Sequence, residues 1–110
     1  MSAKEILIDV FKRQYEKRIQ YVTEKYRKDG EDISNKDVMQ SVREEAYNYF
    51  LSDDFYNETS HHVWLELTAG RMLLEDGAPD KAIEHIKEDA DGKALSQTDK
   101  ELVEIFKKVA

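Results

Sequence analysis

The chain has 110 residues, no Cys, 37% charged residues and a formal net charge of −7. This length predicts one domain, over residues 1–110, and the absence of thiols excludes disulfides, cysteine nucleophiles and thiolate metal sites. Because no apolar run approaches the about 20 residues of a membrane span or forms a secretion leader, we expect a cytoplasmic protein with no membrane association.

The N-terminal part of the chain predicts one long helix, from about residue 3 to residue 28. Apolar side chains recur there at steps of three and four, which places them on one side of a helix. This stripe consists of Ile8, Phe11, Tyr15, Ile19, Val22 and Tyr26. Asp29-Gly30 follows and predicts the end of the helix, since Gly accepts the left-handed conformation common there.

The rest of the chain predicts four or five shorter helices. The first of these begins near Ser34 and ends around Leu51. Residues 53–77 form either one helix or two, because the polar residues 57–62 interrupt the apolar pattern. Pro79 suits the first turn of the next helix, and Ser96 is a cap for the last one. No segment alternates with the period of a strand, so the sequence predicts an all-α bundle of five or six helices.

The segment from Trp64 to Ile86 resembles one helical hairpin of the tetratricopeptide type. Gly70, Gly77 and Ala82 stand at the expected spacing before Ile86. No second copy follows, although such arrays need about three repeats. We therefore interpret the segment as an ordinary pair of helices with close packing at Gly70.

Basic residues concentrate near the N-terminus. Residues 1–28 carry eight Lys or Arg and four Asp or Glu, whereas residues 29–110 carry nine and twenty. The candidate basic patch consists of Lys12, Arg13, Lys17, Arg18 and Lys25. Three interpretations are open: a solvated face, which we favour, a docking helix for an acidic protein or a second copy, and a nucleic-acid surface. The net charge of −7 disfavours nucleic acid as a partner.

The acidic remainder supports a different hypothesis, in which carboxylates imitate phosphates and block a nucleic-acid-binding protein. Acidic side chains are spread over residues 53–91. A solvated acidic surface explains the same residues and is the more common case. Imitation of nucleic acid is therefore kept as an alternative.

Two motifs resemble metal sites, and neither is complete. Aligning Asp89–Gly92 with a calcium loop puts Lys87 at the first ligand position and Thr98 at the twelfth, where Asp and Glu are needed. His61 and His62 lack the repeated Glu-x-x-His pattern of helical metal sites. The chain also contains no nucleophile elbow or phosphate loop. We therefore predict no metal, no cofactor and no enzymatic activity.

The sequence thus favours a non-enzymatic protein–protein interaction module, with a regulatory or adaptor role. The long apolar stripe suggests self-association as a homodimer. The candidate interface consists of Phe11, Tyr15, Ile19, Val22 and Tyr26. The alternative is a nucleic-acid-related role, either through the basic N-terminal helix or through inhibition of a DNA-binding protein by the acidic surface.

Overall fold

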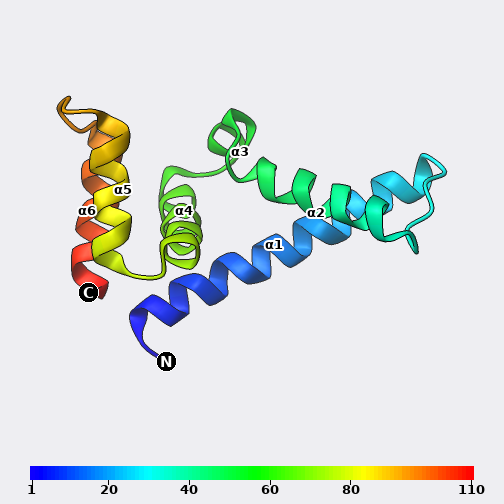
Figure 1. The fold of residues 1–110 in the computed structure, drawn as a ribbon, viewed down its shortest axis with the longest axis horizontal. Helices are drawn as coiled ribbons and strands as arrows, with labels where there is room; N and C mark the ends of the chain where they lie inside the picture. The colour runs from blue at the N-terminus through cyan, green and yellow to red at the C-terminus, as the bar shows by residue number, and fades with distance from the viewer. The chain divides into compact units, whose positions relative to one another are not determined.

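The computed structural model describes all 110 residues and contains six helices and no strand (Figure 1). The predicted all-α fold with a long N-terminal helix is therefore confirmed. The helices are α1 (Ala3–Lys28), α2 (Lys36–Tyr49), α3 (Asp53–Glu58), α4 (His61–Asp76), α5 (Pro79–Ala90) and α6 (Gln97–Val109). None of the six combines the length and the apolar composition that a bilayer crossing requires.

The start of α2 differs slightly from the predicted one. Asn35, rather than Ser34, caps the helix, because its side-chain oxygen accepts hydrogen bonds from the backbone N–H groups of Asp37 (2.8 Å) and Val38 (3.3 Å). Ser34 instead donates its hydroxyl to Asp32. The cap supplies acceptors for N–H groups that have no partner inside the helix.

Residues 53–77 form two helices, which answers the question that the sequence left open. Ser52 starts α3 by accepting a hydrogen bond from the backbone N–H of Phe55 at 3.3 Å. Thr59 then adopts an extended conformation (φ −119°, ψ 146°) and ends the helix. Thr is β-branched and favours such a conformation, so the polar segment breaks the helix before α4 begins at His61.

The six helices belong to two compact units. The first unit contains residues 1–11 and 61–110, and the second contains residues 12–60. The helix α1 contributes its first turns to one unit and its remaining turns to the other. The prediction of a single domain over residues 1–110 stays a prediction.

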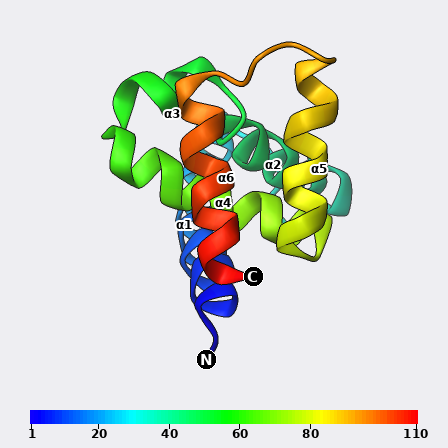
Figure 2. The same ribbon diagram turned by 90° about the vertical axis from the view of Figure 1, so that its left-hand side faces the viewer.

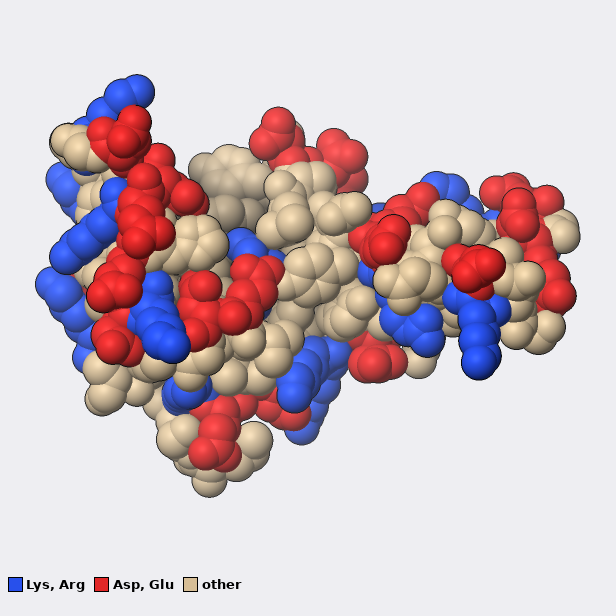
Figure 3. Space-filling model, in the orientation of Figure 1, with Lys and Arg blue, Asp and Glu red and all other residues tan.

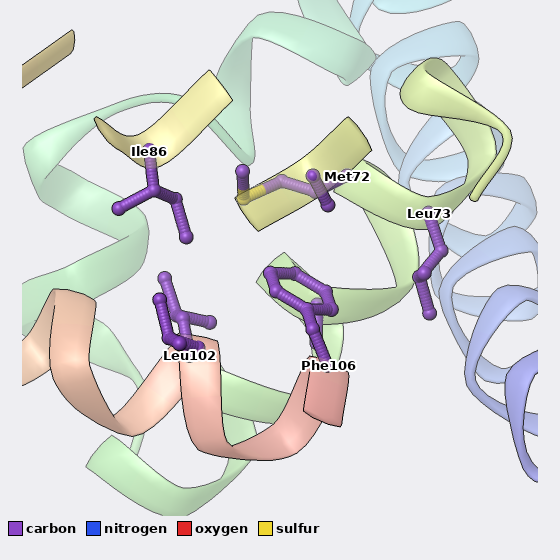
Figure 4. Close-up of a cluster of buried hydrophobic side chains, with 8 residues drawn as sticks. Met72, Leu73, Ile86, Leu102 and Phe106 are labelled. Carbon is purple, nitrogen blue, oxygen red and sulfur yellow. The ribbon is translucent and has the colours of Figure 1, made fainter. Parts of the chain in front are cut away.

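The core of the first unit is formed where α4, α5 and α6 pack on one another. In Figures 1 and 2, α5 and α6 lie side by side, with α4 against them. Met72, Ile86, Leu102 and Phe106 point toward one another in Figure 4, and all four are buried. Burying each such side chain contributes about 1.5–3 kcal/mol, so this cluster holds the three helices together.

Gly70 lets α4 approach the first turns of α1 very closely. A Cβ atom at this position would overlap the carbonyl oxygen of Leu7 and lie 3.0 Å from Cβ of Phe11. The predicted close packing at Gly70 is therefore confirmed, although its partner is α1 and not the following helix. Leu7 and Ile8 also pack against the buried cluster of this unit.

The core of the second unit lies between α1 and α2. Val22, Val42 and Ala46 are buried there. The partly buried side chains around them are Tyr15, Ile19, Tyr26 and Met39. A second, aromatic cluster joins α2 to α3, with 5.1 Å between the ring centroids of Phe50 and Phe55.

Candidate functional site

The apolar stripe that predicts a partner interface is largely covered by the chain itself. Phe11 and Val22 are 0% and 1% exposed. Tyr15, Ile19 and Tyr26 are partly buried against the core of the second unit. Because Phe11 and Val22 are buried against the chain's own apolar side chains, a partner cannot contact them in this fold. Self-association stays a prediction, and the interface would have to include exposed residues outside this stripe.

The candidate basic patch is divided by the structure. Arg18 is stacked on aromatic rings, with its guanidinium carbon 3.6 Å from the centroid of Tyr49 and 4.6 Å from that of Tyr21. Lys25 lies 3.8 Å from a carboxylate oxygen of Glu45. The ring contacts hold Arg18 against its own unit, whereas Lys25 stays exposed beside Glu45.

The exposed cations of the patch also point in different directions. Lys12, Arg13 and Lys17 are exposed. A helix turns by about 100° per residue, so Arg13 and Lys17 share a side, whereas Lys12 lies on another. The structure therefore does not bring the five predicted residues together into one surface.

The Tyr49 ring is a fixed element of the second unit. Its hydroxyl donates a hydrogen bond to Glu58 at 2.7 Å. Burial raises the pKa of Tyr49, and the Glu58 carboxylate raises it further. The stacked Arg18 contributes a cation–π interaction, so this cluster connects α1, α2 and α3 within the unit.

The second unit also contains an open hollow of about 400 Å³ between α1 and α2. Its lining residues are Tyr15, Gln40, Arg43, Glu44, Tyr47 and Asn48. The Tyr15 hydroxyl donates to the backbone carbonyl of Arg43, and Gln40 donates to Glu44. With one base and one acid in its wall, the hollow favours neither a cation nor an anion.

The histidines considered as metal ligands are each paired with a single carboxylate. His61 Nε2 lies 2.6 Å from Glu101, and His62 Nε2 lies 3.0 Å from Glu66. The His61 side chain lowers the pKa of Glu101 through this hydrogen bond. No group of three or more His, Asp or Glu side chains is arranged to hold a metal ion.

A smaller hollow of about 210 Å³ lies among α4, α5 and α6 in the first unit. The buried side chains of Met72, Ile86 and Leu102 form its apolar part. Its other lining residues are Trp64, Thr68, Arg71, His85, Asp89 and Asp99. Below, this cavity is called the α4–α6 hollow.

The charges of the α4–α6 hollow are unevenly paired. Arg71 Nη1 binds both carboxylate oxygens of Glu75 at 3.0–3.1 Å. His85 lies between two carboxylates, 3.3 Å from Asp76 and 3.2 Å from Asp89. The hydrogen bond that the Asp76 carboxylate accepts from His85 raises the pKa of His85. Asp99, by contrast, has no ion-pair partner in the chain.

Two wall residues of the α4–α6 hollow carry a buried polar atom without a hydrogen-bond partner, namely the hydroxyl of Thr68 and Nε of Arg71. Thr68 is 5% exposed, and its hydroxyl oxygen makes no hydrogen bond. Native proteins leave few buried polar atoms in this state, because each one costs about 1–3 kcal/mol. The hydroxyl therefore needs an explanation beyond packing.

A row of carboxylates follows α5 on the outside of the first unit. Asp80, Glu84 and Glu88 recur at steps of four, and Asp91 follows at the left-handed C-cap of the helix (φ 50°); all four are exposed. Steps of this kind place side chains on one side of a helix, about 5–6 Å apart along its axis. Two bases, Lys81 and Lys87, share that side. We call Asp80, Glu84, Glu88 and Asp91 the α5 acidic row, and Figure 3 shows Asp and Glu atoms gathered along this helix.

The first unit has eight Lys or Arg and thirteen Asp or Glu, whereas the second has nine and eleven. The negative charge of the protein is therefore concentrated in the first unit. In the sequence, the acids of residues 53–91 appear as one broad acidic region. The helical period of α5 is the signal that separates this row from the other acids. No family model, no curated protein and no solved structure matches the chain.

Proposed function

We propose that this protein is a non-catalytic binding module that docks the basic surface of a protein partner on its first unit. The α5 acidic row carries the proposal, because it presents three exposed carboxylates along one side of α5 and a fourth at its C-cap, with Lys81 and Lys87 among them. A surface of this kind attracts a row of Lys or Arg on another protein and orients it before contact.

The proposed interaction depends on ionic strength. Exposed charges act over about 8 Å at physiological salt, and over shorter distances as salt rises. Their main effect is on the rate of association and on the choice of partner, more than on the lifetime of the complex. Binding should therefore weaken markedly between low and high salt.

The partner class includes proteins that themselves bind nucleic acid. Such proteins use several Lys and Arg side chains to neutralise phosphates, and carboxylates spaced along α5 offer these side chains an alternative anion. In this second candidate function the protein would compete with nucleic acid for the partner's basic surface. Direct binding of nucleic acid by α1 is less well supported, since its cations do not share one face.

The test compares capture of partners by three forms of the protein. In the first variant, Glu84→Gln, Glu88→Gln and Asp91→Asn neutralise three of the four carboxylates of the α5 acidic row, and Asp80 is kept in the first turn of α5. The matched control, Glu16→Gln, Asp29→Asn and Glu31→Gln, removes the same charge from exposed positions of the second unit. Circular dichroism verifies that both variants keep the helical fold.

Affinity capture from the native cell, followed by mass spectrometry, then identifies proteins bound by each form. We expect at least one basic protein that the wild type and the control retain and that the α5 variant loses. Retention of every captured protein by the α5 variant would show that the acidic row has no part in binding.

A further inference from the structure

We infer that the α4–α6 hollow receives a single Lys or Arg side chain of the protein partner. This inference rests on the proposed function and adds to it a defined anchoring contact. It is drawn from the size of the hollow, its apolar part, the carboxylate of Asp99 and the unpaired hydroxyl of Thr68.

The dimensions of the hollow suit one side chain. Its volume of about 210 Å³ is below the about 300–1,000 Å³ typical of sites for drug-sized ligands. Lys and Arg place an apolar stem of three or four methylene groups against apolar surface and keep the charged end near polar groups. Met72, Ile86 and Leu102 provide the apolar surface for such a stem.

The charges around the hollow select a cation over an anion. The two bases in its wall, Arg71 and His85, are each held by a carboxylate outside the wall, namely Glu75 and Asp76. Asp89 and Asp99 remain in the wall. The sum over these six residues is negative whether His85 is protonated or neutral, so an entering ammonium or guanidinium group is attracted in both states.

Asp99 is the residue most suited to meet the cation. It lies in the first turn of α6, where Ser96 accepts a hydrogen bond from its backbone N–H at 3.1 Å and so fixes its position. Its carboxylate has no cation within the chain. The Trp64 ring is also part of the wall, and an indole ring attracts cations through its π electrons.

Thr68 gives an independent reason to expect a ligand in the hollow. The residue lines the cavity and is buried, yet its hydroxyl has no hydrogen-bond partner. An N–H group of an entering Lys or Arg would provide the donor that this oxygen lacks. Thr68 and Asp99 line the same hollow, so both belong to the wall that the entering side chain contacts.

Trp64 is the only Trp of the chain, so its fluorescence reports directly on the hollow. The full-length protein is titrated with a blocked Gly-Arg-Gly tripeptide, with its Lys counterpart and with a citrulline counterpart that keeps the shape of Arg without its charge. We expect the two cationic peptides to change the Trp64 emission and the citrulline peptide to bind at least about tenfold more weakly.

Two variants assign the binding to the proposed contacts. Asp99→Asn should raise the Kd of the Arg peptide about three- to tenfold, in the range expected for a partly exposed ion pair. The matched control Asp29→Asn, on an exposed acid of the second unit, should leave the Kd unchanged. Thr68→Val, which keeps the shape of the side chain, should also raise the Kd, so the inference stays testable if Asp99→Asn is unstable.

The outcomes separate this inference from the proposed function. Equal binding of the Arg and citrulline peptides, or an unchanged Kd in both Asp99→Asn and Thr68→Val, would overturn the inference. The α5 variant would still lose its partner in the capture experiment if the acidic row binds without an anchoring side chain. Conversely, binding of the peptides in the hollow without any partner that depends on α5 would contradict the proposed function alone.

Discussion

The substitution Gly70→Ala tests the contact between α4 and the first turns of α1. Two opposing effects determine its result. Ala stabilises the interior of a helix by about 0.8–1.0 kcal/mol relative to Gly. The added Cβ, however, would overlap the carbonyl oxygen of Leu7 and lie 2.9 Å from its carbonyl carbon.

Backbone atoms cannot rotate away as the end of a flexible side chain can, so the two segments must separate by at least about 0.5 Å, which weakens the van der Waals contacts around them. Overpacking of this kind costs about 1–3 kcal/mol, and sometimes more. Because the neighbouring side chain of Phe11 is fully buried, its contacts would be lost as well. Because the overlap involves backbone atoms, the cost lies in the upper part of this range, at about 2–3 kcal/mol. After subtraction of the gain in helix propensity, we expect Gly70→Ala to lower the free energy of unfolding by about 1–2 kcal/mol.

Urea unfolding followed by circular dichroism measures this change. The control is Ser41→Ala, at an exposed position inside α2, where only helix propensity changes and a gain of a few tenths of a kcal/mol is expected. If Gly70→Ala proved as stable as the wild type or more stable, with an unchanged dependence on urea, the close approach of α1 to α4 would be refuted.

Three further predictions concern buried polar atoms, a histidine and a helix cap. Thr68→Val removes an unpaired buried hydroxyl and should raise the free energy of unfolding by about 1 kcal/mol in urea titrations; a loss of stability would mean that the hydroxyl has a partner. Asp76→Asn should lower the pKa of His85, measured by NMR titration of the ring protons, because the hydrogen bond that His85 donates to Asp76 is the main cause that raises it. The folded-state pKa of His85 is raised, so protonated His85 stabilises the fold fully below its unfolded-state pKa. This stabilisation is lost as the pH rises through the folded-state pKa. The urea midpoint of the Asp76→Asn variant should therefore depend less on pH over that window. Asn35→Ala removes the cap of α2 and should lower the free energy of unfolding by about 1 kcal/mol. Ser34→Ala should lower it by less. A larger loss for Ser34→Ala than for Asn35→Ala would contradict the assignment of the cap.

The helices themselves could be predicted from the sequence because the signals that define them are local. The apolar period gives the bounds of α1, and Pro79 and Ser96 mark the starts of α5 and α6. The sequence does not decide between Ser34 and Asn35 as the cap of α2, since both residue types suit the position. Only the local backbone conformation determines which side-chain oxygen reaches the free N–H groups.

The surfaces could not be predicted in the same way, because they depend on which helices meet. An apolar stripe such as that of Phe11 and Val22 has the same period whether it packs on its own chain or on a partner. The α4–α6 hollow combines residues such as Trp64, His85 and Asp99 from three helices, and no spacing along the chain relates them. Thr68 did leave a signal, as a polar residue between the apolar Leu67 and Ala69, but its missing partner is visible only in three dimensions.

The contacts between the first turns of α1 and the end of α4 affect the order of folding. Lys4 donates a hydrogen bond to the carbonyl of Gly77, and Gly70 lies against Leu7, although all of residues 12–60 intervene. Contacts between such distant parts of a chain require a long loop to close and form late, whereas contacts between consecutive helices form early. During synthesis, the first turns of α1 are therefore made before α4, and their contacts with Gly70 and Gly77 can form only after α4 has emerged from the ribosome.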